Sequence, residues 1–246
     1  MRNRLDKLLF ERGLAPSRER AQALILAGRV LVDEQKVEKP GAPVVDTASL
    51  RVLGEEQRYV SRGGFKLEAA LDRWHIDLTG RHCADIGAST GGFTDCMLQH
   101  GAASVLAVDT GYGQIAESLR RDPRVRLRER ANARYLKPGE LGPGIEFVSM
   151  DVSFISATLV LPAVLAAVRE NAGSQVEAVI LVKPQFEAGR EHIGKGGIVH
   201  DPAAHQLAID RVRTTALDLG ATVTEVAESP ILGAKGNREF LLHSRF

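Results

Sequence analysis

Residues 85–93 read Asp-Ile-Gly-Ala-Ser-Thr-Gly-Gly-Phe and join the apolar stretch Cys83–Ile86 to a helical pattern that begins at Phe93. Glycines at these positions permit a sharp turn and let the backbone approach a ligand closely. The spacing differs from the Gly-x-Gly-x-x-Gly fingerprint of dinucleotide-binding proteins, and no Walker lysine follows it. A carboxylate at the head of the loop disfavours a pyrophosphate and suits a cationic ligand such as S-adenosylmethionine.

Strand and helix patterns alternate on the carboxyl-terminal side of this loop. After Cys83–Ile86, the predicted strands are Val105–Val108, Phe147–Met150, Val179–Val182, Thr222–Ala227 and Glu239–His243. The first predicted helix begins near Lys66, and the others are Phe93–His100, Gly113–Arg120, Ser156–Glu170 and Pro202–Leu219. This alternation predicts an α/β, Rossmann-like domain whose largely parallel sheet is covered on both faces. Only a loop separates the last two strands, which predicts a terminal antiparallel hairpin.

Acidic residues at two successive strand ends strengthen the prediction of a cofactor loop. Asp85 ends the first strand, and Asp109 ends the second, where a carboxylate can accept hydrogen bonds from a ribose. A purely structural turn is the alternative for the glycines alone. The candidate cofactor-binding residues are Asp85, Gly87, Ser89, Gly91, Gly92, Phe93 and Asp109.

Residues 1–55 predict a separate, small α+β domain. Apolar residues recur at helical spacing from Leu5 to Leu9, and Ser17 is suited to cap a second helix that ends at Gly28. Short strand patterns follow. Residues 56–62 are predicted to form a linker, and residues 63–246 the α/β domain.

The order of residues in the first domain resembles the RNA-binding module of ribosomal small-subunit protein four. The matching segments are Arg4–Leu9, Ser17–Ala21, Gly28–Val32 and Lys39–Gly41. The resemblance implies binding to structured RNA, chiefly through shape and phosphate contacts. It makes Arg4, Arg18 and Arg20 candidate RNA contacts, with a solvated helix face as the alternative.

Composition limits the classes of protein that remain. The formal net charge of the 246 residues is +1, so any nucleic-acid site must be local rather than global. Two cysteines are too few for a disulfide scaffold and lack the spacing of metal ligands. The amino terminus has no signal-peptide pattern, and the longest apolar stretch, Ala157–Val168, is too short to span a bilayer. A cytoplasmic protein without a membrane segment is expected, and the sequence does not indicate its oligomeric state.

Four further polar residues lie where one active site could gather them. Asp151 and Lys183 directly follow predicted strands, Lys66 lies at the start of a helix, and Glu239 enters the last apolar run. Open α/β sheets collect their chemistry at such positions. Taken singly, each has a structural alternative, such as a helix cap, a snorkelling lysine or a solvated strand residue.

The residues after the predicted strand Phe147–Met150 narrow the possible methyl acceptors. Asp151–Phe154 reads Asp-Val-Ser-Phe and lacks the two prolines typical of amine methyltransferases. Methylation at carbon five of a pyrimidine requires a cysteine nucleophile, whereas Cys83 and Cys96 lie within a strand and a helix. A hydroxyl acceptor remains, with Lys183 as its base or orienter. Neighbouring ammonium and carboxylate groups act on a lysine proton in opposite directions, so the identity of the base stays open.

Six segments are similar to the TlyA family, which comprises rRNA 2′-O-methyltransferases with an FtsJ-like catalytic domain that are often named hemolysins. They are Ser61–Leu67, Asp85–Phe93, Val108–Gln114, Asp151–Ser156, Val182–Glu187 and Lys235–Glu239. The resemblance implies a class I methyltransferase sheet, S-adenosylmethionine as cofactor, ribosomal RNA or a ribosomal subunit as partner, and no metal. It assigns a catalytic tetrad to Lys66, Asp151, Lys183 and Glu239 and places Asn132 near the adenosine.

Two other classes of function compete with an RNA methyltransferase. One is a membrane-active hemolysin, which the lack of a signal or spanning segment disfavours. The other is a ribosome-binding factor without activity, which the intact glycine loop and tetrad disfavour.

Two segments keep alternative interpretations. Gly189–Asp201 is either a loop over the acceptor or an ordinary connection, and the arginines from Arg120 to Arg130 form either an RNA surface or a solvated face.

Overall fold

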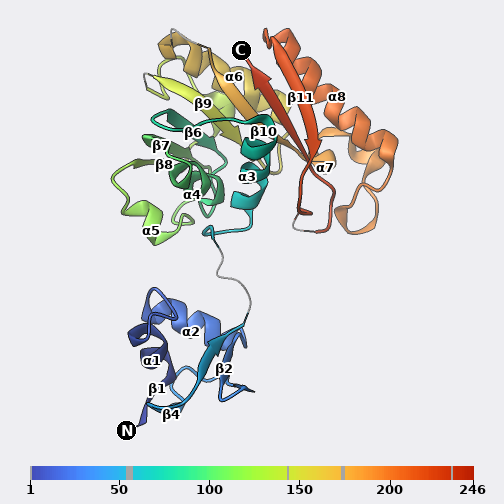
Figure 1. The fold of residues 1–246 in the computed structure, drawn as a ribbon. Helices are drawn as coiled ribbons and strands as arrows, with labels where there is room; N and C mark the ends of the chain where they lie inside the picture. The colour runs from blue at the N-terminus through green and yellow to red at the C-terminus, as the bar shows by residue number, and fades with distance from the viewer. Residues whose placement is uncertain (1, 54–57, 143, 173–174, 234) are drawn as a thin grey trace. The chain divides into compact units, whose positions relative to one another are not determined.

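The chain folds into two units, Met1–Glu56 and Gln57–Phe246, in a computed structural model (Figure 1). The structure describes residues 2–53, 58–142, 144–172, 175–233 and 235–246. Part of the predicted linker, residues 56 and 57, lies outside the described residues. Its remainder already belongs to the second unit, because Tyr59 is buried in that unit's core and the Val60 N–H donates to Asp95 at 2.8 Å.

The first unit combines two short helices with two small sheets, as predicted for an α+β domain. Its elements are β1 (Arg2–Arg4), α1 (Leu5–Glu11), α2 (Arg18–Leu26), β2 (Val30–Val32), β3 (Gln35–Lys36), β4 (Pro43–Val45) and β5 (Leu50–Val52). Strands β1 and β4 pair, and β3, β2 and β5 form the second sheet. Ser17 caps α2, since its hydroxyl accepts the Arg20 N–H at 3.1 Å. Leu5, Leu9 and Ile25 fill the core between the helices.

A seven-stranded sheet forms the centre of the second unit. Its strands are β6 (His82–Ile86), β7 (Ser104–Val108), β8 (Val125–Arg128), β9 (Ile145–Met150), β10 (Glu177–Val182), β11 (Val223–Glu228) and β12 (Phe240–Arg245). The spatial order is β11-β12-β10-β9-β6-β7-β8. Strands β6 to β10 pair in parallel, whereas β12 is antiparallel to both β10 and β11. The predicted terminal hairpin is therefore present, with its second strand inserted between β10 and β11.

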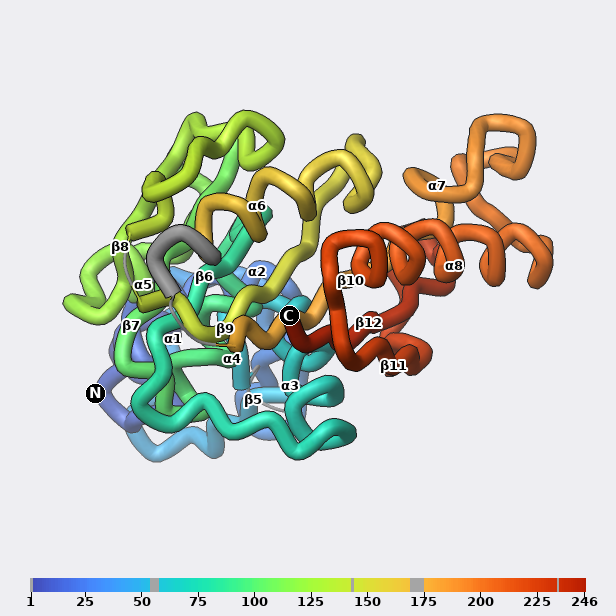
Figure 2. The backbone as a smooth tube through the Cα atoms, turned by 90° about the horizontal axis from the view of Figure 1, so that it is seen from above, coloured from blue at the N-terminus to red at the C-terminus, as the bar shows by residue number. Residues whose placement is uncertain are grey.

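Alternating side chains attach helices to both faces of the sheet. In β10, Val179 and Leu181 pack in the core beneath α3 (Gly63–Trp74) and α4 (Gly92–Gln99). Ile180 and Val182 belong to the opposite core, beneath α6 (Ala157–Ala172) and α8 (Pro202–Asp218). Figure 2 shows α6 and α8 on one side of the strands and α3 and α4 on the other. This burial on both faces explains why the strands read as continuous apolar runs.

Two local predictions differ from the structure. The segment Gly113–Arg120 is not one helix: only α5 (Glu117–Arg120) is helical, since Gly113 has a φ of +71° and its N–H donates to Glu129 at 2.8 Å. Strand β8 was not predicted, because Arg126 and Arg128 alternate with its apolar residues at the edge of the sheet. The remaining short helical segments are η1 (Ala133–Tyr135), α7 (Pro184–Glu187), η2 (Arg190–His192) and η3 (Lys195–Gly197).

Candidate active site

Two adjoining cavities lie at the carboxyl ends of the parallel strands. The larger, the lysine cavity, has a volume of about 510 Å³ and is lined by Lys66 and Lys183 among others. The smaller, the Asp109 cavity, has a volume of about 290 Å³. The residues common to both linings are Gly87, Ser89, Asp151, Ser153 and Phe154. The two cavities therefore meet at the glycine loop and at the end of β9.

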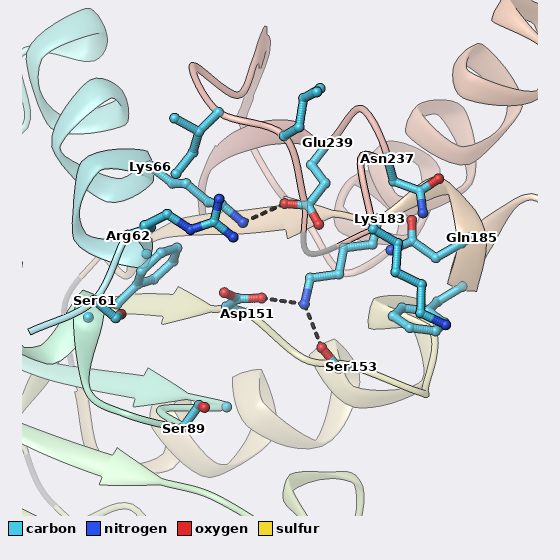
Figure 3. Close-up of a pocket in the computed structure, with 18 of the residues that line it drawn as sticks. Ser61, Arg62, Lys66, Ser89, Asp151, Ser153, Lys183, Gln185, Asn237 and Glu239 are labelled. Atoms are coloured by element: carbon cyan, nitrogen blue, oxygen red, sulfur yellow. Dashed lines mark hydrogen bonds and ion pairs between the residues drawn. The ribbon is translucent and has the colours of Figure 1, made fainter. Parts of the chain in front are cut away.

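The four predicted polar residues come together in the lysine cavity as two ion pairs (Figure 3). Lys66 Nζ lies 2.5 Å from Glu239 Oε2, and Lys183 Nζ lies 2.6 Å from Asp151 Oδ1. Lys66, Lys183 and Glu239 are 9%, 8% and 3% exposed. Charged groups this deeply buried are stable only when they are paired with an opposite charge. Within each ion pair, one charged group therefore fixes the position of the other.

The register of the sheet explains why residues far apart in sequence meet here. Val182 pairs with Phe240 in the antiparallel ladder between β10 and β12, so Lys183 and Glu239 leave the sheet side by side. Asp151 follows the neighbouring strand β9, whose Met150 pairs with Ile180. Lys66 comes from the first turn of α3, which packs across β12.

Ser153 is a partner of Lys183 that the sequence did not reveal. Lys183 Nζ donates to Ser153 Oγ at 2.6 Å, so this ammonium group lies between a carboxylate and a hydroxyl. Other polar residues of the cavity that were not predicted include Ser61, Arg62, Gln185 and Asn237. All four lie in the segments Ser61–Leu67, Val182–Glu187 and Lys235–Glu239, whose family resemblance is the signal that the sequence offered.

Gly87 and Gly91 have different roles in the loop. Gly87 has a φ of +87°, and a Cβ there would lie 2.4 Å from the carbonyl oxygen of Asp151. Gly91, with a φ of +94°, does not line either cavity; a Cβ there would overlap the Leu119 side chain. Gly91 thus packs against Leu119, and its predicted ligand contact stays a prediction, whereas Gly87, Ser89, Gly92 and Phe93 line the lysine cavity.

Asp85 faces the protein interior and lines neither cavity. Its side chain is fully buried and accepts hydrogen bonds from Thr94 Oγ1 at 2.6 Å and Ser149 Oγ at 3.1 Å. Alternation along β6 causes this orientation, because the residues on either side, Ala84 and Ile86, face the opposite core. Its carboxyl group therefore supports the glycine loop from behind, and the predicted cofactor contact of Asp85 stays a prediction. Burial raises the pKa of Asp85 to about 7, although both hydrogen bonds oppose the rise.

The raised pKa of Asp85 predicts a pH-dependent stability. The folded state retains a proton that the unfolded chain releases near pH 4, so the free energy of unfolding falls between about pH 4 and pH 7. The loss is as much as about 4 kcal/mol, at about 1.4 kcal/mol per pKa unit. Asp85→Asn keeps one acceptor oxygen and places an NH2 donor where the second oxygen was, as the protonated carboxyl group also combines an acceptor with a donor. Because asparagine does not titrate, the stability of the variant relative to the wild type should rise over this range.

Urea unfolding of both proteins at several pH values, followed by the fluorescence of Trp74, measures this difference. Trp74 is the chain's one tryptophan and lies in the second unit, so the signal reports on the unit that contains Asp85. Stability curves that run parallel from pH 4 to pH 7 would contradict the assignment.

The Asp109 cavity combines polar ends with apolar walls. Asp109 accepts the Ser89 N–H through Oδ2 at 2.8 Å and the Gly111 N–H through Oδ1 at 2.6 Å. Asn132 lines the same cavity, together with the apolar residues Val152 and Ile155. A flat, largely apolar ring with a hydroxylated sugar fits such a lining.

Both cysteines lie in the core rather than in the cavities. Burial raises the pKa of the Cys83 and Cys96 thiols to about 12, so both are protonated at neutral pH. Neither residue lines a cavity. Because the thiolate is the nucleophile, these residues do not supply covalent catalysis.

In the first unit, two of the three predicted RNA contacts converge on one buried carboxylate. Arg4 binds Asp6 through Nε at 3.0 Å and Nη2 at 2.9 Å, and Arg18 Nη2 lies 3.4 Å from Asp6 Oδ2. Asp6 is fully buried, and hydrogen bonds from Arg4 above all, with those from Gln22 and the Lys7 N–H, hold its pKa well below the usual range against the effect of burial. Arg20 has no side-chain ion pair within the described part of the chain. The guanidinium groups of Arg4 and Arg18 are about half exposed and therefore reachable by RNA.

The arginines around β8 are largely engaged within the second unit. Arg120 pairs with Glu129 at 2.6 Å, Arg124 with Asp122 at 2.7 Å, and Arg128 with Glu140 at 3.0 Å. These pairs favour the interpretation of a solvated face.

Among the described residues, no helix is both long enough and apolar enough to cross a bilayer.

Comparisons with known proteins agree with this geometry. Residues 59–246 match the family described as FtsJ-like methyltransferase, and residues 3–47 match the S4 domain. The 16S/23S rRNA (cytidine-2′-O)-methyltransferase TlyA of Mycobacterium tuberculosis is 46% identical over 99% of this chain and 90% of that protein. Hemolysin A of Brachyspira hyodysenteriae is 40% identical over 98% of both chains. A solved structure from Streptococcus thermophilus, 44% identical, covers 99% of this chain and 88% of its own length with a TM-score of 0.73.

Proposed function

The chain belongs to the TlyA family of FtsJ-like methyltransferases, and from this premise we propose that it methylates the 2′-hydroxyl of a cytidine ribose in ribosomal RNA. The observation that carries the proposal is the meeting of the two cavities at Asp151. A methyl donor in one cavity can there reach an acceptor in the other. The Lys66–Glu239 and Lys183–Asp151 pairs surround the acceptor side of this junction.

The residues of the Asp109 cavity suit S-adenosylmethionine. Asp109 and Asn132 would hold the adenosine end, with the base between Val152 and Ile155. Because Gly87 has no side chain, the charged end of the ligand could pass close to the backbone there and extend toward the lysine cavity. When bound, the cofactor supplies a methyl group on a sulfonium, which is reactive toward an aligned oxygen nucleophile.

The tetrad then aligns the acceptor and manages its proton. Alignment of the ribose oxygen supplies much of the rate, because methyl transfer is an in-line displacement. As the oxygen would take up the methyl group and the sulfonium–methyl bond would break, the hydroxyl proton would leave toward the Lys183–Asp151 pair. Ser153 holds Lys183 in place from the other side, and Lys66 with Glu239 closes the cavity opposite them.

Incubation of the purified protein with S-adenosylmethionine and unmodified ribosomal subunits tests this function. We expect a methylated cytidine whose 3′ phosphodiester resists alkaline cleavage, since the neighbouring 2′ oxygen is blocked. A methyl group on a base, or none in ribosomal RNA, would contradict the proposal.

We further propose that Arg4, Arg18 and Arg20 contact RNA phosphates. Arg18→Ala combined with Arg20→Ala should weaken RNA binding and reduce the slope of log K against log salt by about 1 to 2, at about 0.7–0.9 per phosphate contact. Fluorescence anisotropy over a salt series measures the slope. Arg51→Ala is the matched control, because Arg51 lies in the same unit and is paired with Glu34 on the exposed surface. An unchanged slope in the double variant would rule out phosphate contacts there.

A further inference from the structure

The flap, residues Gly189–Ile198, forms part of the wall of the lysine cavity. Ile193 and Gly197 line this cavity together with Lys183 and Asp151. The flap has little regular structure beyond the short turns η2 and η3, and Gly189, Gly196 and Gly197 have positive φ angles. The backbone hydrogen bonds of the flap, such as that from the Gly194 N–H to the Ile198 carbonyl at 2.8 Å, join residues within the flap to one another.

The carboxyl-terminal end of the flap is fastened by the side chain of Asn237. Asn237 Oδ1 accepts the Val199 N–H at 2.9 Å, and Asn237 Nδ2 donates to the Gly197 carbonyl at 2.9 Å. The amide thus satisfies one acceptor of the flap, the Gly197 carbonyl, and one donor directly after the flap, the Val199 N–H. Asn237 is 2% exposed, so water does not replace these bonds when they are lost.

The same residue also organises the wall on the other side of the cavity. The Asn237 carbonyl accepts the Gly233 N–H at 2.8 Å. Gly233 in turn packs against the Glu239 carboxylate so closely that a Cβ there would overlap Oε1. Asn237 therefore connects the flap to the surroundings of Glu239, whose carboxylate pairs with Lys66.

We propose that Asn237 is a positioning residue that fixes the flap as the wall against which the acceptor ribose binds. The inference rests on the proposed function for the identity of the acceptor. It adds a residue outside the tetrad whose effect falls on acceptor binding rather than on cofactor binding, because Asn237 lines the lysine cavity and not the Asp109 cavity.

Two variants separate this role from a general requirement for folding. Asn237→Asp is nearly isosteric and keeps the acceptor for Val199, but it places a carboxylate oxygen against the Gly197 carbonyl. Asn237→Ala removes both bonds. Gln206→Ala is the matched control, since it deletes an amide from the exposed face of α8, where the Gln206 side chain donates to Asp210.

Three measurements on the full chain test the proposal. For both Asn237 variants, KM for the ribosomal RNA substrate should rise about tenfold, as expected for the loss of a buried hydrogen bond. The affinity for S-adenosylmethionine should stay within about twofold of the wild type. In Asn237→Ala, hydrogen exchange of the Val199 amide should accelerate about tenfold. The Gln206→Ala control should match the wild type in all three.

The exchange and cofactor measurements do not depend on methyl transfer, so they remain informative if the proposed substrate is wrong. Unchanged exchange at Val199 would overturn the proposal, because Asn237 would then not hold the flap. Faster exchange with an unchanged KM would overturn it as well, because the flap position would not serve the acceptor. Weakened cofactor affinity would assign Asn237 a different role.

Discussion

Lys183→Ala is expected to reduce methyl transfer by about 10³-fold or more, within the usual range for loss of a group that handles a proton and aligns the acceptor. The variant removes the cation 2.6 Å from Asp151 and the donor to Ser153. Binding of S-adenosylmethionine should stay within about threefold, because Lys183 does not line the Asp109 cavity. Single-turnover kinetics and calorimetry measure the two effects separately.

Two further substitutions sharpen this result. Lys137→Ala removes an exposed lysine of the same unit that lines neither cavity, and it should behave as the wild type. Lys183→Arg keeps the charge but cannot release its proton at neutral pH. Activity retained by the arginine variant would assign Lys183 to orientation, whereas its loss would favour proton transfer. Normal turnover by Lys183→Ala would refute both roles.

Gly87→Ala should abolish both cofactor binding and turnover. The new Cβ would lie 2.4 Å from the Asp151 carbonyl oxygen and 2.9 Å from its carbonyl carbon, and both atoms belong to the backbone. Relief of this overlap requires separation of the glycine loop from the end of β9, which is where the two cavities meet. The positive φ of +87° adds strain of about 1 kcal/mol or more.

Gly80→Ala is a control that introduces backbone strain at a positive φ without a steric overlap of the new Cβ. Gly80 has a φ of +74° in the same unit, but a Cβ there meets nothing within 4 Å. The control variant should therefore lose some stability yet bind S-adenosylmethionine normally. Thermal unfolding and calorimetry of the two variants make the comparison. Equal cofactor affinity in both would contradict the close approach at Gly87.

The fold was largely predictable because local patterns carry it. Continuous apolar runs mark the strands buried on both faces, and within the seven-stranded sheet only β8 escaped prediction, since arginines alternate with its apolar residues. The short strands β1 and β3 of the first unit, which are polar, were not predicted either. The short α5 was misjudged because Gly113 donates to Glu129, a contact with a residue sixteen positions away. Side-chain hydrogen bonds of this kind leave no periodic signal.

The sequence predicted the four charged residues that meet in the lysine cavity, but not their contacts or the cavity's other polar residues. Strand ends locate Asp151 and Lys183, yet their pairing follows from the order of strands in the sheet. Asp85 shows the limit most clearly, because only the direction of alternation along β6 decides whether its carboxylate faces a ligand or Thr94. The roles of Ser153 and Asn237 likewise depend on partners 30 or more residues away.

The ion pair between Lys66 and Glu239 joins residues separated by 173 positions. During synthesis at roughly 5–20 residues per second, the ribosome needs on the order of ten to thirty seconds to advance from one to the other. A growing polypeptide thus completes its RNA-binding unit and its glycine loop well before its tetrad. The tetrad is complete only after Glu239 has been synthesised, whereas the first unit and the glycine loop are synthesised earlier. The order of synthesis therefore delays the onset of catalysis.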